Sequence, residues 1–249
     1  MYGSDIGGFT GEPTPELFTR WFQLGSFLPF FRVHCAFHLP RREPWEWGEE
    51  VMDRLRASLR TRYRLLPHWY TLALSAARDG APMVRPLAWL DPALRGVDDE
   101  LLVGDDLLVA PVLSAGATSR RVVLPAGTWH DAVTGVPVRD GAVVPAGLDR
   151  IPWFVRSGAV VPTEEVRDGV RSLVLLVAPP EGTAPGPGGR LVTDAGDGWD
   201  RPHEEAYQVQ RRDGAVVVTR AILAQGASPY AAVGVRCVDG SPARLVTEG

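Results

Sequence analysis

Several features that would narrow the class of this 249-residue protein are scarce in its sequence. Two cysteines occur, Cys35 and Cys237, and their wide separation favours free buried thiols over a disulfide framework. No segment approaches the length of about 18 apolar residues that spans a bilayer, and no basic stretch followed by an apolar one opens the chain. We therefore expect no membrane association and no signal peptide, and a location in the reducing cytoplasm.

Strong charge and internal repetition are missing as well. The net charge of -4 gives nucleic acid or an anionic membrane no strong attraction, so we expect neither as a partner. No repeat of about 20 to 50 residues is visible, which argues against a solenoid or propeller. The composition is that of an ordinary globular protein, with 45% hydrophobic and 22% charged residues. The chain is long enough to form one large domain or two small ones.

Helical periodicity is confined to the first 80 or so residues. Residues 15–24 open with Pro and Glu and place apolar side chains on one face, which predicts a helix of about ten residues that stops near Gly25. Residues 29–34 are rich in aromatic side chains and predict a short buried strand. A longer helix is expected from about residue 49 to 78, bent or broken at Pro67.

Beyond Pro82 the sequence changes to short β-type runs separated by Gly, Pro and Asp. The runs comprise residues 107–112, 121–124, 143–144, 159–161, 173–177 and 215–219. They predict one or two β-sandwich domains. Residues 181–190 are too rich in Gly and Pro for the interior of an element, so we expect a long loop there.

A series of short motifs follows one order along the chain. They read S-D-I-G-G-F (4–9), F-F-R-V-H (30–34), R-E-P-W (42–45), R-Y-R-L-L-P-H-W-Y (62–70), P-M-V-R-P-L (82–87), D-L-L-V-A-P-V (106–112), L-P-A-G-T-W-H-D (124–131) and I-P-W-F-V-R-S-G-A-V-V-P (151–162). In this order they resemble the closing part of a glycoside hydrolase family 31 catalytic domain, strongly to residue 165 and weakly beyond. That family contains α-glucosidases and α-xylosidases.

The resemblance implies an architecture. We expect the last two β/α units of a TIM (β/α)8 barrel at residues 1–81, a proximal β-sandwich at 82–165 and a distal β-sandwich at 166–249. Active sites of such barrels lie at the carboxyl ends of the strands, where Asp5 and His34 would stand. Residues 191–199 are similar to an aspartate- and glycine-rich turn of the family, although Thr193 and Ala195 depart from it. We expect turn chemistry in this run, because it lacks the ligand spacing of an EF-hand calcium loop.

The implied chemistry is hydrolysis of an α-linked oligosaccharide or α-glycoside with retention. It needs two carboxyl groups about 5–5.5 Å apart. In the family both aspartates lie upstream of S-D-I-G-G-F, so we expect this chain to contain neither the nucleophile nor the acid/base and to be inactive alone. No cofactor or metal is implied. A separately encoded N-terminal half is a possible partner, and a gene fragment, a misassigned start and a split enzyme all stay open.

Four residues are candidate contacts of a sugar: Asp5, Phe9, Arg32 and His34. By the resemblance Asp5 lies in the sugar pocket and His34 binds the non-reducing-end glycosyl unit, for which an imidazole offers one donor and one acceptor. The alternatives are a turn aspartate that caps its own backbone and a core histidine satisfied by the backbone. Arg32 either orients an active-site carboxylate or forms a buried ion pair. Phe9 either lines the cleft or packs in the core.

Two neighbouring motifs have plainer interpretations. His34, Cys35 and His38 form an H-C-x-x-H cluster, but no second Cys/His pair follows at finger spacing, and we expect no metal there. Glu43 of R-E-P-W is expected to pair with a neighbouring arginine or to cap the turn ahead of the long helix.

Three hypotheses for function follow. The chain is the C-terminal part of an α-glycosidase, a carbohydrate-binding β-sandwich module with a vestigial barrel segment, or a structural fragment without affinity for sugar. For residues 1–80 in isolation we expect instability, because two barrel strands expose unpaired edges and an apolar inner face.

Overall fold

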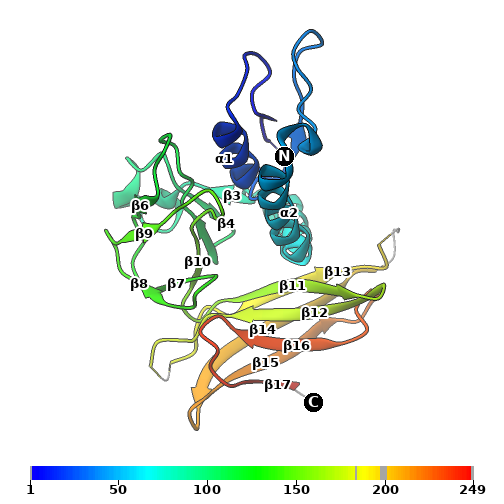
Figure 1. Ribbon diagram of the computed structural model, residues 1–249. Helices are drawn as coiled ribbons and strands as arrows, with labels where there is room; N and C mark the ends of the chain where they lie inside the picture. The colour runs from blue at the N-terminus through cyan, green and yellow to red at the C-terminus, as the bar shows by residue number, and fades with distance from the viewer. Residues whose placement is uncertain (1, 183, 197–200, 248–249) are drawn as a thin grey trace.

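A computed structural model describes residues 2–182, 184–196 and 201–247 (Figure 1). The helices are α1 (Pro15–Gly25), α2 (Glu49–Arg64) and α3 (Leu66–Asp79), with the 3-10 turns η1 (Pro44–Trp47), η2 (Leu87–Trp89) and η3 (Pro92–Leu94). The strands are β1 (Asp5–Ile6), β2 (Arg32–Val33), β3 (Val84–Arg85), β4 (Leu101–Val103), β5 (Leu107–Val109), β6 (Ser119–Arg121), β7 (Trp129–Asp131), β8 (Pro137–Val138), β9 (Val143–Pro145), β10 (Trp153–Arg156), β11 (Val160–Arg167), β12 (Val170–Val177), β13 (Gly189–Thr193), β14 (His203–Arg212), β15 (Ala215–Ala224), β16 (Val233–Cys237) and β17 (Ala243–Thr247).

The first group of elements alternates strand and helix. β1 and β2 pair in parallel, with Asp5 opposite Arg32. The expected helix at 15–24 is confirmed as α1, since Pro15 occupies its first turn and the Thr14 hydroxyl accepts from the Leu17 amide at 3.2 Å. The strand expected at 29–34 is shorter than predicted. β2 covers two residues because β1, with which it pairs, also has two.

The long helix expected from 49 to 78 is two helices. α2 ends at Arg64 and α3 begins at Leu66, so the chain breaks two residues before Pro67. Proline has no amide hydrogen to donate and fits the first turn of a helix, where no intrahelical acceptor is required. Pro67 therefore starts a new helix, which confirms the expected break.

The second group is a β-sandwich with layers of unequal size. Its main sheet has the order β3-β4-β5-β10-β7-β8, and β6 and β9 form a two-stranded layer beside it. Alternate residues of the main sheet face opposite sides, as Leu102 and Leu108 pack with Trp129 beneath the small layer while Val103 and Leu107 face the helices. The expected proximal sandwich is confirmed.

The third group is also a sandwich. The sheet β11-β12-β16 packs against the sheet β13-β14-β15-β17 around side chains from both, including Leu175, Tyr207 and Val218. The boundary expected between residues 165 and 166 falls inside β11, which pairs along its whole length with β12. The change of sheet therefore comes before Val160. Each predicted β run overlaps a strand, and the described part of the loop expected at 181–190 ends where β13 begins at Gly189.

One core joins the three groups. It contains Phe27, Leu65 and Trp69 from the first, Val84, Val103, Leu107, Val109 and Val155 from the second, and Val161 and Leu176 from the third. Figure 1 shows the cyan helix α3 running from the first group to the distal strands. Residues 1–80 are consequently packed against both sandwiches in this chain. In the part of the chain that the structure describes, no helix is long and apolar enough to cross a membrane.

Candidate functional site

The turn after β1 is shaped by two glycines. Gly7 and Gly8 both have φ of 84°, a conformation that side chains with a Cβ rarely adopt. A Cβ on Gly7 would also lie 2.9 Å from the Phe18 ring. The turn closes when the Gly8 amide donates to the Asp5 carbonyl at 2.8 Å. S-D-I-G-G-F is therefore a strand end followed by a tight reversal that leads to Phe9.

Asp5 and Arg32 form an ion pair across the two strands. Arg32 Nε and Nη2 both donate to Asp5 Oδ1, at 3.0 and 2.5 Å. The Asp5 side chain is 17% exposed and that of Arg32 is 49% exposed. The carboxylate thus accepts from Arg32 with one oxygen, and the pair lies at the surface rather than in a buried core.

Phe9 and His34 meet beside this pair. Their ring centroids lie 5.8 Å apart at an angle of 34°, and the Ala36 amide donates to the Phe9 carbonyl at 2.9 Å. Phe9 is 53% exposed and His34 is exposed as well, so neither packs in the core. The loops after β1 and β2 are joined here, and Figure 1 shows both extending away from the sandwiches.

The structure places the four candidate residues in two contacting pairs. Asp5 and Arg32 are the first residues of β1 and β2, and Phe9 and His34 lie in the loops that follow these strands. Together they supply a carboxylate, a half-exposed guanidinium, an exposed imidazole and an exposed aromatic ring. This set of groups is able to accept from, donate to and stack against a polyhydroxylated ring. Asp5 is the carboxylate in it, whereas retaining glycoside hydrolysis uses two, about 5–5.5 Å apart.

Arg42 is a residue whose role the sequence did not indicate. Its buried guanidinium donates to three backbone carbonyls of the glycine turn, those of Gly7 at 2.7 Å, Gly8, and Gly11 at 2.6 Å. The R-E-P-W motif marked the position, but nothing in it pointed to residues more than 30 positions earlier. Arg42 fixes the path of the chain between Asp5 and Phe9.

Glu43 does not form the expected pair. Arg42 is directed at the glycine turn, and the Glu43 side chain makes no cap hydrogen bond to η1. Among the described residues, Glu43 Oε2 is buried without a hydrogen-bond partner. The expected partners were Arg41 and Arg42: Arg42 donates to distant carbonyls instead, and no ion pair joins the exposed Arg41 to Glu43 among the described residues.

The H-C-x-x-H cluster is held by other contacts. Cys35 Sγ donates to the Pro40 carbonyl at 3.6 Å, and His34 packs against Phe9. Within residues 2–182, 184–196 and 201–247, no group of three His, Cys, Asp or Glu side chains is placed to hold a metal. In the aspartate-rich run, Asp194 Oδ1 accepts from the Gly196 amide at 2.7 Å, which is a turn contact; residues 197–200 of that run lie outside the described part.

Two buried titratable groups lie away from the cluster. Burial lowers the pKa of His68 to about 4, and the Val103 carbonyl 3.4 Å from its Nε2 offsets this in part. Burial raises the pKa of Glu205, but hydrogen bonds from Arg220, Tyr207 and His203 outweigh it and hold the pKa below its ordinary value. Both side chains are buried, and their hydrogen-bond partners do not include the four candidate residues.

Comparison with known proteins decides the family. The model of the glycosyl hydrolases family 31 TIM-barrel domain matches residues 1–72, and that of the family 31 C-terminal domain matches residues 80–161. The chain belongs to glycoside hydrolase family 31. The second match ends where the strands of this family 31 chain change from the proximal to the distal sandwich.

Family 31 relatives are similar over most of the chain. Human "Neutral alpha-glucosidase AB" is 37% identical over 226 residues, which is 84% of this chain and 23% of the relative. A solved glucosidase II alpha subunit has a TM-score of 0.82 at 28% identity, covering 94% of this chain and 28% of its own. The GH31 alpha-xylosidase from Xanthomonas citri has a TM-score of 0.78 at 32% identity, covering 95% and 28%. The chain thus spans about a quarter of the length of these relatives.

Proposed function

We propose that this chain is the C-terminal part of a retaining α-glycosidase. In this proposal Asp5, Phe9, Arg32 and His34 form one wall of the sugar pocket, and residues outside this sequence supply the nucleophile and the acid/base. The observation that carries the proposal is the pair of contacts, Asp5 with Arg32 and Phe9 with His34, formed by two short parallel strands and the loops after them in a family 31 chain. Its substrate is an α-linked oligosaccharide or α-glycoside.

Each residue has a role that its contacts suggest. Asp5 Oδ1 is engaged by Arg32, so Oδ2 is the atom that accepts from a sugar hydroxyl. Arg32 also holds the carboxylate in place, while the half-exposed part of its guanidinium faces solvent. His34 donates to one hydroxyl and accepts from its neighbour, and the exposed Phe9 ring covers the apolar face of the pyranose.

Binding of sugar by the chain alone tests the wall. Titration with α-methyl glucoside, followed by NMR, is expected to shift the amides of Phe9 and Ala36. His34→Ala is expected to weaken this binding at least about three- to tenfold, the value of one of its two neutral hydrogen bonds. His38→Ala is the matched control, because His38 is exposed on the same loop. Equal affinity of the two variants contradicts the assigned role of His34.

Hydrolysis tests the origin of the catalytic groups. The purified chain is expected to show no turnover of p-nitrophenyl α-glucoside or α-xyloside. Turnover that persists through purification and disappears in Asp5→Asn would show that the chain carries its own catalytic carboxylates, and the proposal would be wrong.

A separately encoded N-terminal half is the proposed partner. Within the described residues β1 and β2 pair with each other alone, which leaves an open strand edge on either side. Large apolar side chains stand exposed in the segments beside these strands, among them Tyr2, Phe30 and Phe37. Sequencing the neighbouring DNA tests this proposal: a separate coding segment with the two missing aspartates is expected. An upstream segment in frame with this chain, or the absence of any such segment, contradicts a separately encoded half.

A further inference from the structure

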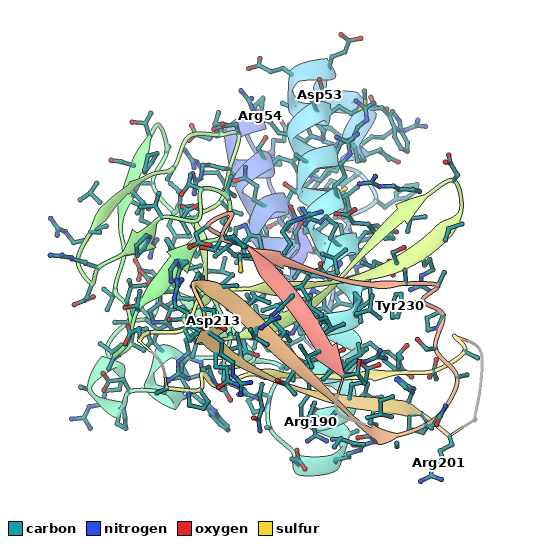
Figure 2. All side chains as sticks on the ribbon, turned by 90° about the horizontal axis from the view of Figure 1, so that it is seen from below. Asp53, Arg54, Arg190, Arg201, Asp213 and Tyr230 are labelled. Carbon is teal, nitrogen blue, oxygen red and sulfur yellow. The ribbon has the colours of Figure 1, made fainter. Side chains whose placement is uncertain are left out.

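A cavity lies near the chain that enters β2, whereas His34 lies in the loop that leaves this strand. Its volume is about 650 Å³, within the range of about 300–1,000 Å³ that is usual for ligand pockets. Pro29, which precedes β2, lines the cavity. The other walls are α3, the end of β13, and the segment between β15 and β16 on which Figure 2 labels Tyr230.

Hydrogen bonds between α3 and β13 hold two of these walls together. The Val192 amide donates to Thr71 Oγ1 at 3.0 Å, and the Tyr70 hydroxyl donates to Asp194 Oδ2. Asp194 is held in turn by the Gly196 amide on its other oxygen. The cavity is therefore preformed by contacts between the first and third groups of elements, and does not depend on the four residues of the sugar wall.

Both arginines that line the cavity already have partners. Arg62 donates to backbone carbonyls, among them that of Leu28 at 2.7 Å. Arg171 donates to Glu164 at 2.7 and 3.0 Å, and its guanidinium lies 5.3 Å from the centre of the Tyr230 ring. An anionic ligand would have to break one of these arrangements, so the charges disfavour a phosphate or carboxylate ligand.

The remaining lining combines three aromatic residues with aliphatic ones such as Leu66 and Met83. Trp69, Tyr70 and Tyr230 contribute rings, and Tyr70 is 40% exposed. The Tyr230 hydroxyl and the Asp194 carboxylate add a donor and an acceptor. Rings with polar tips suit a ligand that has apolar C–H faces and a rim of hydroxyl groups. We propose that this cavity is a second, noncatalytic binding site for a neutral oligosaccharide, separate from the sugar wall.

Titration of the whole chain with maltotriose, followed by the amide signals of named residues, tests this site. Thr193 and Gly196 report on the cavity, and Phe9 and Ala36 report on the sugar wall. We expect the Thr193 and Gly196 signals to shift with maltotriose, to do so equally in His34→Ala, and not to shift with inorganic phosphate. Shifts at Phe9 alone, or at Thr193 with phosphate in place of maltotriose, overturn the second site.

Variants separate this site from the proposed function. Tyr230→Ala is expected to weaken the response at Thr193 at least tenfold and to leave that at Phe9 unchanged. Tyr70→Ala, at a partly exposed position, is expected to do the same if Tyr230→Ala does not fold. Tyr63→Ala is the matched control, because Tyr63 is exposed on α2 and lies outside the cavity lining. Equal responses in the cavity variants and the control overturn the inference, whereas loss of the Phe9 response alone contradicts only the proposed function.

Discussion

Replacing Arg42 with Met is expected to loosen the turn that carries Asp5 and Phe9. Arg42 donates to the carbonyls of Gly7, Gly8 and Gly11, and its side chain is buried. Leaving the buried Gly7 carbonyl unpaired costs about 1–3 kcal/mol, and water replaces the two partly buried bonds at a smaller residual cost. We therefore expect the turn to be destabilised by about 2–4 kcal/mol.

Hydrogen exchange of the Gly8 amide measures this loss directly, because that amide closes the turn on the Asp5 carbonyl. At about 1.4 kcal/mol for each factor of ten, exchange through local opening should be about 30- to 700-fold faster. The exchange rate of the Gly8 amide in Arg42→Lys should lie between those of the unchanged chain and Arg42→Met. The lysine ammonium group keeps the charge but cannot span three carbonyls.

Arg41→Met is the matched control, because Arg41 is adjacent and exposed. Equal exchange rates of Gly8 in the Arg41 and Arg42 variants would refute the reasoning. A slow Gly8 amide in Arg42→Met would show that the glycines hold the turn unaided.

Three further predictions concern the core and its buried charges. Leu65→Ala should lower the free energy of unfolding by about 2–5 kcal/mol in urea, because Leu65 is 1% exposed in the core that joins all three groups; a loss below 1 kcal/mol contradicts that packing. His68 is neutral in the fold with a pKa of about 4 but charges near pH 6.5 when unfolded, so the chain should lose roughly 2 kcal/mol between pH 7 and 5, and His68→Gln should lose less. Glu205 has a lowered pKa, so its stabilisation is present above the unfolded pKa of about 4.3 and lost as pH falls through the folded pKa. Acid unfolding of Glu205→Gln should therefore depend less steeply on pH below about 4, and an unchanged profile would exclude that contribution.

Local patterns predicted the elements whose formation depends on nearby residues. The helix at 15–24 follows from Pro15 and one apolar face, and the break in the long helix follows from Pro67. The strand at 29–34 was overestimated because its length is set by β1, and apolar side chains at these positions pack against helices instead. The domain boundary expected between residues 165 and 166 falls inside β11 for the same reason. The length of β11 is set by its pairing with β12, which the sequence of β11 alone does not reveal.

Part of the candidate site could likewise be predicted from local motifs, and part could not. The motifs S-D-I-G-G-F and F-F-R-V-H located Asp5, Phe9, Arg32 and His34, and the structure pairs Asp5 with Arg32 and Phe9 with His34. Arg42 escaped prediction because hydrogen bonds to backbone carbonyls leave no trace in the identity of the accepting residues. Their roles toward a sugar stay predictions that the binding experiments test.

The link between α3 and β13 has a consequence for how the chain is made. Thr71 and Val192, which it joins, are 121 residues apart. At a synthesis rate of about 5–20 residues per second, α3 leaves the ribosome roughly 6–24 s before its partner strand. During that delay the proximal sandwich emerges and is able to pack on Trp69, but α3 still lacks its contact with β13. Completion of the joint core is therefore a late event in biosynthesis, and slower translation lengthens the interval in which part of α3 is uncovered.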